Sequence, residues 1–140
     1  MAEEYMQVDV VTPERSVLSR KAIEVVAPGS QGEFGVLIGH TPFLTTLKPG
    51  QIIVRTEDRD IYLACGGGFA EIISNRVIIL AETAEMAEDI KADEVKEELE
   101  QIREKLRQLG KDDPEFDKWE KRLHRAEIKL RVLENWEKSR

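Results

Sequence analysis

Cysteine, histidine and long apolar runs are scarce in this chain of 140 residues. Its one cysteine, Cys65, cannot form an internal disulfide bond and lies in the apolar run IYLAC, so we expect a buried thiol. The two histidines, His40 and His124, are not part of a cluster with metal-ligand spacing. No run approaches the roughly 18 apolar residues of a membrane-spanning helix, and the N-terminus does not resemble a signal peptide. We therefore expect no metal centre and no membrane span.

The chain also has no excess of basic residues. The chain carries 28 acidic and 21 basic side chains, for a net charge of −7. Proteins that bind nucleic acids in general depend on a positively charged surface. Nucleic acid is therefore excluded as a general partner.

The composition changes along the chain. From Tyr5 to Leu80 it is rich in Val, Ile, Gly and Thr, whereas from Glu82 onward Glu, Lys, Arg, Leu and Ala dominate, with only Gly110 and Pro114 as breakers. Such a shift is typical of a β domain followed by a helical one. We predict an α+β fold with a β domain at 1–86 and a helical domain at 87–140.

Short β-prone runs, separated by turn sequences and without intervening helices, fill the first part. They are 6–11, 16–19, 22–27, 35–38, 51–56, 60–65, 69–73 and 76–81. This even spacing favours an antiparallel sandwich or barrel. The glycines at 66–68 precede a strand pattern and lack the lysine of a phosphate loop, so they indicate a bulge or a close contact within the sheet.

The second part has two stripes of apolar residues at helical spacing, separated by the segment 110–114. The stripes are Val95, Leu99, Ile102, Leu106 and Leu109, and then Phe116, Trp119, Leu123, Ala126, Leu130 and Leu133. They predict an antiparallel helical hairpin. Gly110 is expected to end the first helix, and Asp113 to cap the second with Pro114 at its first position.

The second helix has two features beyond these stripes. A second apolar row of Ile128, Val132 and Trp136 should rest on the sandwich or on another protein. Basic residues also outnumber acidic ones on this helix. The basic residues are Lys118, Lys121, Arg122, Arg125, Lys129 and Arg131. They indicate either an acidic partner or an ordinary solvated face.

Two segments carry a resemblance to a known family. GEFGVLIGHTPFLTTLKPG at 32–50 and GGGFAEIISNRVIILAE at 66–82, preceded by VDVVTPER at 8–15, resemble the epsilon subunit of bacterial and chloroplast F-type ATP synthases. The mitochondrial delta subunit belongs to the same family. The resemblance implies a flattened sandwich of about ten short strands in two sheets, followed by the two-helix hairpin.

The resemblance also implies a function. The protein would be a non-catalytic rotor subunit of the central stalk, coupling proton-driven rotation of the c-ring to ATP synthesis. Its sandwich would bind the gamma subunit and the c-ring, with Glu33 and His40 in the loops that face the ring. Its location would be peripheral, at the cytoplasmic face of the bacterial plasma membrane. His40 has a second interpretation, as a turn histidine whose ring bonds to the loop backbone.

In this family the second helix can leave the hairpin and extend along the shaft. Its basic residues then meet an acidic loop of the catalytic beta subunits, in the alpha/beta head, and block ATP hydrolysis. By resemblance this role falls to Lys118, Lys121, Arg122, Arg125 and Lys129.

Some bacterial relatives bind ATP through a motif written Ile/Leu-Asp-x-x-Arg-Ala. The matching stretch here keeps Ile90, but Lys91 replaces the aspartate, and Glu94 and Val95 replace the Arg-Ala pair. A carboxylate in place of arginine repels phosphate. We predict weak or absent ATP binding and no cofactor.

Two further functions are compatible with parts of the sequence. A free-standing enzyme would have to use the scattered carboxylates Asp9, Glu24, Asp60 and Glu71, whose spacing shows no nucleophile–base pair. A regulatory adaptor unrelated to energy coupling would bind through the sheet and the helices. The enzyme predicts hydrolytic activity of the isolated chain, which the rotor subunit and the adaptor do not.

Overall fold

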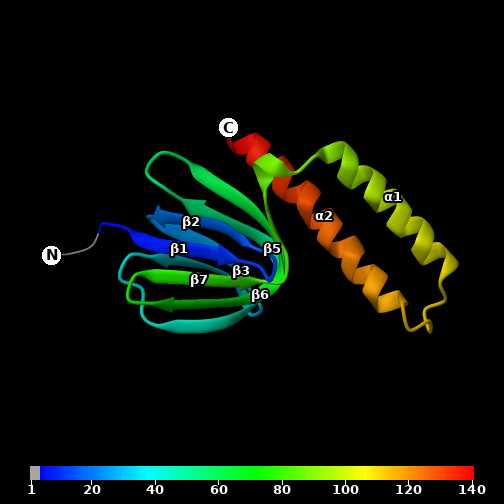
Figure 1. The fold of residues 1–140 in the computed structure, drawn as a ribbon, viewed down its shortest axis with the longest axis horizontal. Helices are drawn as coiled ribbons and strands as arrows, with labels where there is room; N and C mark the ends of the chain where they lie inside the picture. The colour runs from blue at the N-terminus through cyan, green and yellow to red at the C-terminus, as the bar shows by residue number, and fades with distance from the viewer. Residues whose placement is uncertain (1–3) are drawn as a thin grey trace.

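The computed structural model describes residues 4–140, in which eight strands are followed by a short 3-10 helix and two α-helices (Figure 1). The strands are β1 (Met6–Val11), β2 (Ser16–Ala22), β3 (Glu24–Gly29), β4 (Gly32–Leu37), β5 (Phe43–Arg55), β6 (Asp60–Ile73), β7 (Arg76–Ala81) and β8 (Ala84–Met86). The helices are η1 (Ala87–Asp89), α1 (Ala92–Gln108) and α2 (Phe116–Ser139). The expectation that the N-terminus is not a signal peptide concerns, in part, residues 1–3, which lie outside the described residues.

The strands pair in the order β2-β1-β7-β6-β5-β3-β4, with β8 also on β6. All pairs are antiparallel except β1 with β7, which is parallel. β5 and β6 are 13 and 14 residues long and pair along almost their full lengths. They bend together, so each contributes to both layers of a sandwich. The predicted antiparallel sandwich is confirmed.

We call the layers by their strands. Layer 1 contains β2, β1, β7, the second half of β6 and the first half of β5, and layer 2 contains β8, the first half of β6, the second half of β5, β3 and β4. Because β5 and β6 each count once in each layer, the eight strands form the expected number of about ten strand segments. The first half of β5 was not predicted from the sequence, because Pro49 and Gly50 resemble a turn. They instead lie at the bend, where a proline is tolerated.

The glycines of β6 lie at the same bend. A Cβ atom on Gly68 would lie 2.0 Å from the Leu80 carbonyl oxygen, and the φ angle of Gly68 is +150°. Only glycine combines this backbone conformation with so close a neighbouring strand. The predicted close contact within the sheet is therefore confirmed.

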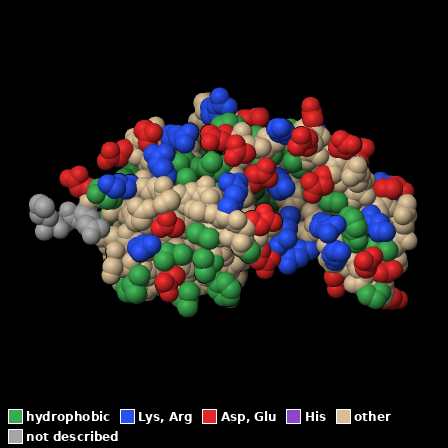
Figure 2. Space-filling view, in the orientation of Figure 1, with side chains coloured by type: hydrophobic (Ala, Val, Ile, Leu, Met, Phe, Trp, Pro, Cys, Tyr) green, Lys and Arg blue, Asp and Glu red, His purple; other side chains and the backbone are tan. Residues whose placement is uncertain are grey.

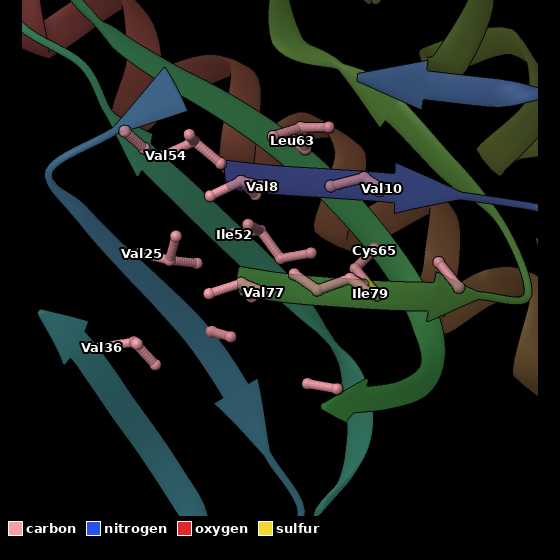
Figure 3. Packing of buried hydrophobic residues seen from close by; sticks show 14 of the residues in the cluster. Val8, Val10, Val25, Val36, Ile52, Val54, Leu63, Cys65, Val77 and Ile79 are labelled. Atoms are coloured by element: carbon pink, nitrogen blue, oxygen red, sulfur yellow. The ribbon is translucent and has the colours of Figure 1, made fainter. Parts of the chain in front are cut away.

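The core between the layers consists of aliphatic side chains (Figure 3). Val8, Ile52 and Ile79 come from three different strands and are fully buried. The alternation in β1, where every second residue is buried, follows from the opposite directions of successive side chains in a strand. Cys65 also lies in this core, and burial raises the pKa of its thiol, as expected for a small apolar side chain.

The hairpin forms as predicted, with one correction at the start of α2. Leu109 is extended and ends α1, with Gly110 following. Asp113 Oδ1 accepts the Glu115 N–H at 2.8 Å, but regular helix begins only at Phe116 and Glu115 is the N-cap. The reason is an intervening turn, in which the Phe116 N–H bonds to the Asp113 carbonyl. Pro114 is therefore in this turn and not in the helix.

It is α2, and not α1, that lies against the sandwich (Figure 1). Ile128 and Val132 are buried in one cluster with Ala64 of β6, and Tyr62 and Trp136 pack against that cluster. The second apolar row of α2 thus rests on layer 2, which confirms the first of its two predicted locations. None of the helices in the described part of the chain is long and apolar enough to cross a membrane.

Candidate functional site

Three of the basic side chains of α2 face the sandwich. Lys121, Arg125 and Lys129 are spaced by four residues and therefore lie on one side of the helix. Lys121 Nζ is 3.3 Å from Glu82 Oε2, and Lys129 Nζ is 3.4 Å from Glu85 Oε2. Figure 2 shows acidic and basic side chains interleaved where the helices meet the sandwich. The basic residues stand out in the sequence, but their acidic partners do not, because nothing local connects Glu82 to a helix that starts more than 30 positions later.

Arg125 makes the most specific of these contacts. Its Nη2 atom donates to the Gly66 carbonyl oxygen at 3.0 Å and also pairs with Glu82. Gly66 leaves the room for this approach, because a Cβ atom there would lie 2.9 Å from Arg125 Nε. One guanidinium thereby joins the backbone of β6 to the carboxylate that follows β7.

The two cations lower the pKa of Glu82. The largest cause is the hydrogen bond from Lys121, followed by the charge of Lys121, and Arg125 acts in the same direction. Both partners favour the ionised carboxylate. Glu82 therefore carries its charge throughout the neutral range.

The other basic residues of α2 point elsewhere. The Arg122 guanidinium lies 4.6 Å from the centre of the Trp119 ring, and Lys118 is exposed. Within residues 4–140, Lys118 and Arg122 have no ion pair. The structure thus divides the five predicted residues into three that contact the sandwich and two that do not.

His40 lies in the loop between β4 and β5. Its Nδ1 atom is 2.6 Å from the Thr41 carbonyl oxygen, and its ring centre is 6.0 Å from that of Phe43. This contact confirms that the ring bonds to the loop backbone. Leu37, the last residue of β4, and Ile38, the first residue of the loop, are also exposed, at 59% and 37%.

Glu33 is exposed in the hairpin between β3 and β4, and not in the His40 loop. The strand from Glu33 to Leu37 is about 13 Å long at 3.3 Å per residue, and the His40 N–H bonds to the Leu37 carbonyl. Of the two residues predicted to face the ring, Glu33 therefore lies near the start of β4 and His40 lies in the loop that follows its end.

The outer surface of layer 1 exposes a group of large apolar side chains. Phe69 lies between Thr46 and Leu80 on the neighbouring strands, and Leu44 lies one pair further along. Leu44, Phe69 and Leu80 are 67%, 53% and 54% exposed. Figure 2 shows hydrophobic side chains gathered on this part of the sandwich. We call Leu44, Phe69 and Leu80 the apolar face.

The apolar face was not predicted from the sequence, although β7 carries one signal of it. The run VIILA at 77–81 is apolar at every position, whereas a strand with one solvated face alternates. Val77, Ile79 and Ala81 point into the core, which leaves Ile78 and Leu80 on the outside.

The stretch that matches the ATP motif lies between η1 and α1. Ile90 and Val95 are buried in the cluster under the hairpin. Lys91 Nζ is 3.9 Å from Glu94 Oε1, and both side chains are largely exposed. The one cation of this stretch is thus directed at a carboxylate, and the first turn of α1 is otherwise acidic.

The scattered carboxylates do not converge. Glu24 and Asp60 both bind Arg55, at 2.9 and 2.6 Å. Asp9 accepts a hydrogen bond from Ser19 at 2.6 Å, and Glu71 is exposed on layer 1. No group of three metal-ligating side chains is found among the described residues. Apart from Glu71, these carboxylates contact basic or hydroxyl side chains, and within residues 4–140 they do not come together as a nucleophile–base pair.

Comparisons with known proteins agree with this description. The family model described as "ATP synthase, Delta/Epsilon chain, beta-sandwich domain" matches residues 5–87. The ATP synthase epsilon chain of Anaeromyxobacter sp. (strain K) is 42% identical over 127 residues, covering 91% of this chain and 96% of the relative. That of Geotalea uraniireducens is 39% identical over 132 residues, covering 94% and 95%.

Two solved structures have a similar fold. A chain of the Euglena gracilis mitochondrial ATP synthase, solved as OSCP/F1/c-ring, has a TM-score of 0.69 at 22% identity and covers 99% of this chain and 83% of its own. A chain of the Tetrahymena thermophila mitochondrial ATP synthase central stalk and c-ring has a TM-score of 0.58 at 14% identity, covering 95% and 99%. At these identities the likeness concerns the fold alone.

Proposed function

The chain belongs to the delta/epsilon family of ATP synthase subunits, and on this premise we propose that it couples proton-driven rotation of the c-ring to ATP synthesis. Its epsilon-chain relatives make it a non-catalytic rotor subunit of that complex. We assign the coupling to a β domain at 1–86 and a braking function to a helical domain at 87–140. The complex would hold it peripherally at the cytoplasmic face of the bacterial plasma membrane.

The apolar face is the observation that carries the proposal for the coupling domain. Leu44, Phe69 and Leu80 expose more than half of their surface on layer 1, while the hairpin covers layer 2. Exposed apolar groups of this kind mark protein interfaces. We assign the apolar face to the gamma subunit, and the His40 loop, with Leu37 and Ile38, to the c-ring.

The gamma assignment is tested with the full-length chain. Leu80→Asp should weaken binding of purified gamma at least about tenfold, because it buries a charge at the centre of an apolar contact. The matched control is Ile23→Asp. Ile23 is similar in size to Leu80, is 39% exposed and lies between β2 and β3, away from the apolar face. Equal gamma affinity of Leu80→Asp and the wild-type chain would refute the assignment.

We propose further that α2 inhibits ATP hydrolysis by placing basic side chains against an acidic loop of the catalytic beta subunits. Lys118 and Arg122 support this role, because they carry charge that no carboxylate of the described residues neutralises.

The double reversal Lys118→Glu and Arg122→Glu should raise ATP hydrolysis by the assembled complex about threefold, because like charges would then face each other. Lys111→Glu, in the loop between the helices, changes charge without touching α2 and serves as the control. An unchanged rate of ATP hydrolysis with the double variant, in a normally assembled complex, would refute the brake.

The isolated chain should not bind ATP tightly. Calorimetry with ATP added to the isolated chain measures this.

A further inference from the structure

Asn75 connects three parts of the sandwich. It lies in the turn between β6 and β7, the two strands that carry two of the three residues of the apolar face. Its backbone carbonyl oxygen accepts the Gln7 N–H of β1 at 3.0 Å. Its side-chain Oδ1 atom accepts the Gly39 N–H at 2.7 Å, across 36 positions of the chain. One residue thereby joins layer 1 to the loop between β4 and β5.

The Gly39 N–H is available for this bond because of the local turn. The His40 N–H bonds to the Leu37 carbonyl oxygen at 3.1 Å, and the φ angle of Gly39 is +86°. This is a β-turn with Gly39 at its third position, where a positive φ calls for glycine. The hydrogen bond of the turn itself does not use the N–H of that third residue, and Asn75 Oδ1 is the acceptor that it meets instead.

The backbone of Asn75 is held in place from both sides. Ile73 of β6 pairs with Arg76 of β7, so Ser74 and Asn75 form a two-residue hairpin turn. Their φ angles are +47° and +58°, as in the hairpin turns that favour asparagine. The bond from Gln7 fixes the same peptide to β1. The acceptor that meets Gly39 is therefore presented by a rigid part of layer 1.

The rest of the His40 loop, residues 38–42, has little else to attach it. The His40 ring bonds within the loop, to the Thr41 carbonyl oxygen. Among the described residues, the bond from Gly39 to Asn75 is the one hydrogen bond that residues 38–42 make to an element other than β4. The orientation of Ile38 and Gly39 relative to layer 1 thus depends on Asn75.

We propose that Asn75 is a positioning residue, which holds the His40 loop against layer 1 and so keeps Ile38 in place for the partner that this surface binds. The effect on binding rests on the proposed assignment of this surface to the c-ring, whereas the position of the loop is a property of the chain alone. Because the turn of Asn75 joins the strands of the apolar face, the same hydrogen bond fixes the two proposed contact surfaces relative to each other.

Hydrogen exchange of single amides in the full-length chain, followed by NMR, tests the position of the loop. Asn75→Gly keeps the positive φ angle and removes the acceptor, so the Gly39 amide should exchange about fivefold faster. Asn75→Asp tolerates the same backbone and keeps an oxygen acceptor, so it should restore the wild-type rate or slow the exchange further. The amides of β6 and β7 should keep their protection in both variants.

The matched control is Ser74→Gly, which changes the other turn residue of positive φ and leaves Asn75 in place. Its Gly39 amide should exchange like that of the wild-type chain. A Gly39 amide that exchanges at the wild-type rate in Asn75→Gly would overturn the proposal. Equally fast exchange in Asn75→Gly and Asn75→Asp would also overturn it, because the effect would then not come from the acceptor.

Binding of the full-length variants to purified, detergent-solubilised c-ring tests the consequence for the partner. Asn75→Gly should lower the affinity about threefold and Asn75→Asp should restore it, because a loosened loop must be ordered again on binding. Ile38→Asp tests the c-ring assignment independently and should lower the affinity about tenfold.

The two substitutions separate the two claims. If Ile38→Asp weakens c-ring binding and Asn75→Gly does not, the c-ring assignment is supported and the positioning role in binding is refuted. If neither substitution weakens c-ring binding while the Gly39 amide responds to Asn75→Gly, the hold on the loop is supported and the c-ring assignment is refuted.

Discussion

The sandwich and the hairpin bury apolar surface in different ways. Core residues of the sandwich such as Val8, Ile52 and Ile79 are enclosed between two layers and have no exposed surface. The hairpin is attached through one side of one helix, and the ion pairs at the edge of that contact remain partly open to water. Enclosed aliphatic contacts resist salt and pH, whereas partly exposed ion pairs are screened. One chain thus combines an enclosed sandwich with a hairpin whose attachment includes contacts that water and salt can reach.

A substitution in the sandwich core should have the largest effect on stability. Ile79→Ala should lower the free energy of unfolding of the sandwich by about 3 kcal/mol, because it leaves a cavity between the layers. The neighbouring Leu80→Ala affects a side chain that is 54% exposed and should cost only about 0.5 kcal/mol. Urea denaturation measures both, and equal costs would contradict the assigned layering.

A substitution under the hairpin should separate the two regions. Ile128→Ala should weaken docking of the hairpin by about 2 kcal/mol and leave the sandwich unchanged. In a urea titration, the helical circular-dichroism signal at 222 nm would then be lost at a lower urea concentration than the hydrogen-exchange protection of the β6 and β7 amides. His124→Ala, on an exposed part of the same helix, is the control. A single coincident transition in the variant would show that hairpin and sandwich unfold as one unit.

Acid should loosen the hairpin slightly and through Glu82. The pKa of this carboxyl is below its ordinary value of 4.5 when α2 is docked, so the docked form binds fewer protons than the released form. Its contribution to docking is therefore complete above about pH 4.5 and declines as the pH falls through the lowered pKa. For so exposed a group we expect a loss of about 0.5 kcal/mol.

The urea midpoint of the helical signal, measured between pH 6 and pH 3, tests this dependence. Glu82→Gln should flatten it, whereas Glu71→Gln should not, because Glu71 has no ion pair among the described residues. A pH profile that is the same in Glu82→Gln and in the wild-type chain would exclude Glu82 as its source.

The sequence predicted much of the fold because its signals are local. The alternation in β1 and the heptad stripes of the helices are properties of residues two to four positions apart. The alternation matches the buried residues of β1, and all stripe residues except Leu109 and Phe116 are buried in the cluster under the hairpin or pack against it. Signals that combine distant residues were not readable. Pro49 and Gly50 looked like a turn, and only the pairing of β5 with β6 shows that they lie within a bent strand.

The candidate site was predicted in part. The five basic residues of α2 were found as a group, but their division depends on which side of the helix meets the sandwich. The apolar face was missed, because a continuous apolar strand does not reveal which of its two sides another layer covers. Glu33 and His40 were expected to face the ring, and that expectation stays a prediction; the structure adds that most of β4 lies between the two residues.

By itself, the sequence determined the order and type of the elements, the division between strands and helices, and membership of the family. Local spacing and residue type are sufficient for these properties. Only the tertiary structure decided how β5 and β6 bend, that β1 pairs in parallel with β7, and that Arg125 meets Glu82 across 43 positions. The physical reason is that long-range pairing depends on the packing of complete elements, which no local pattern encodes.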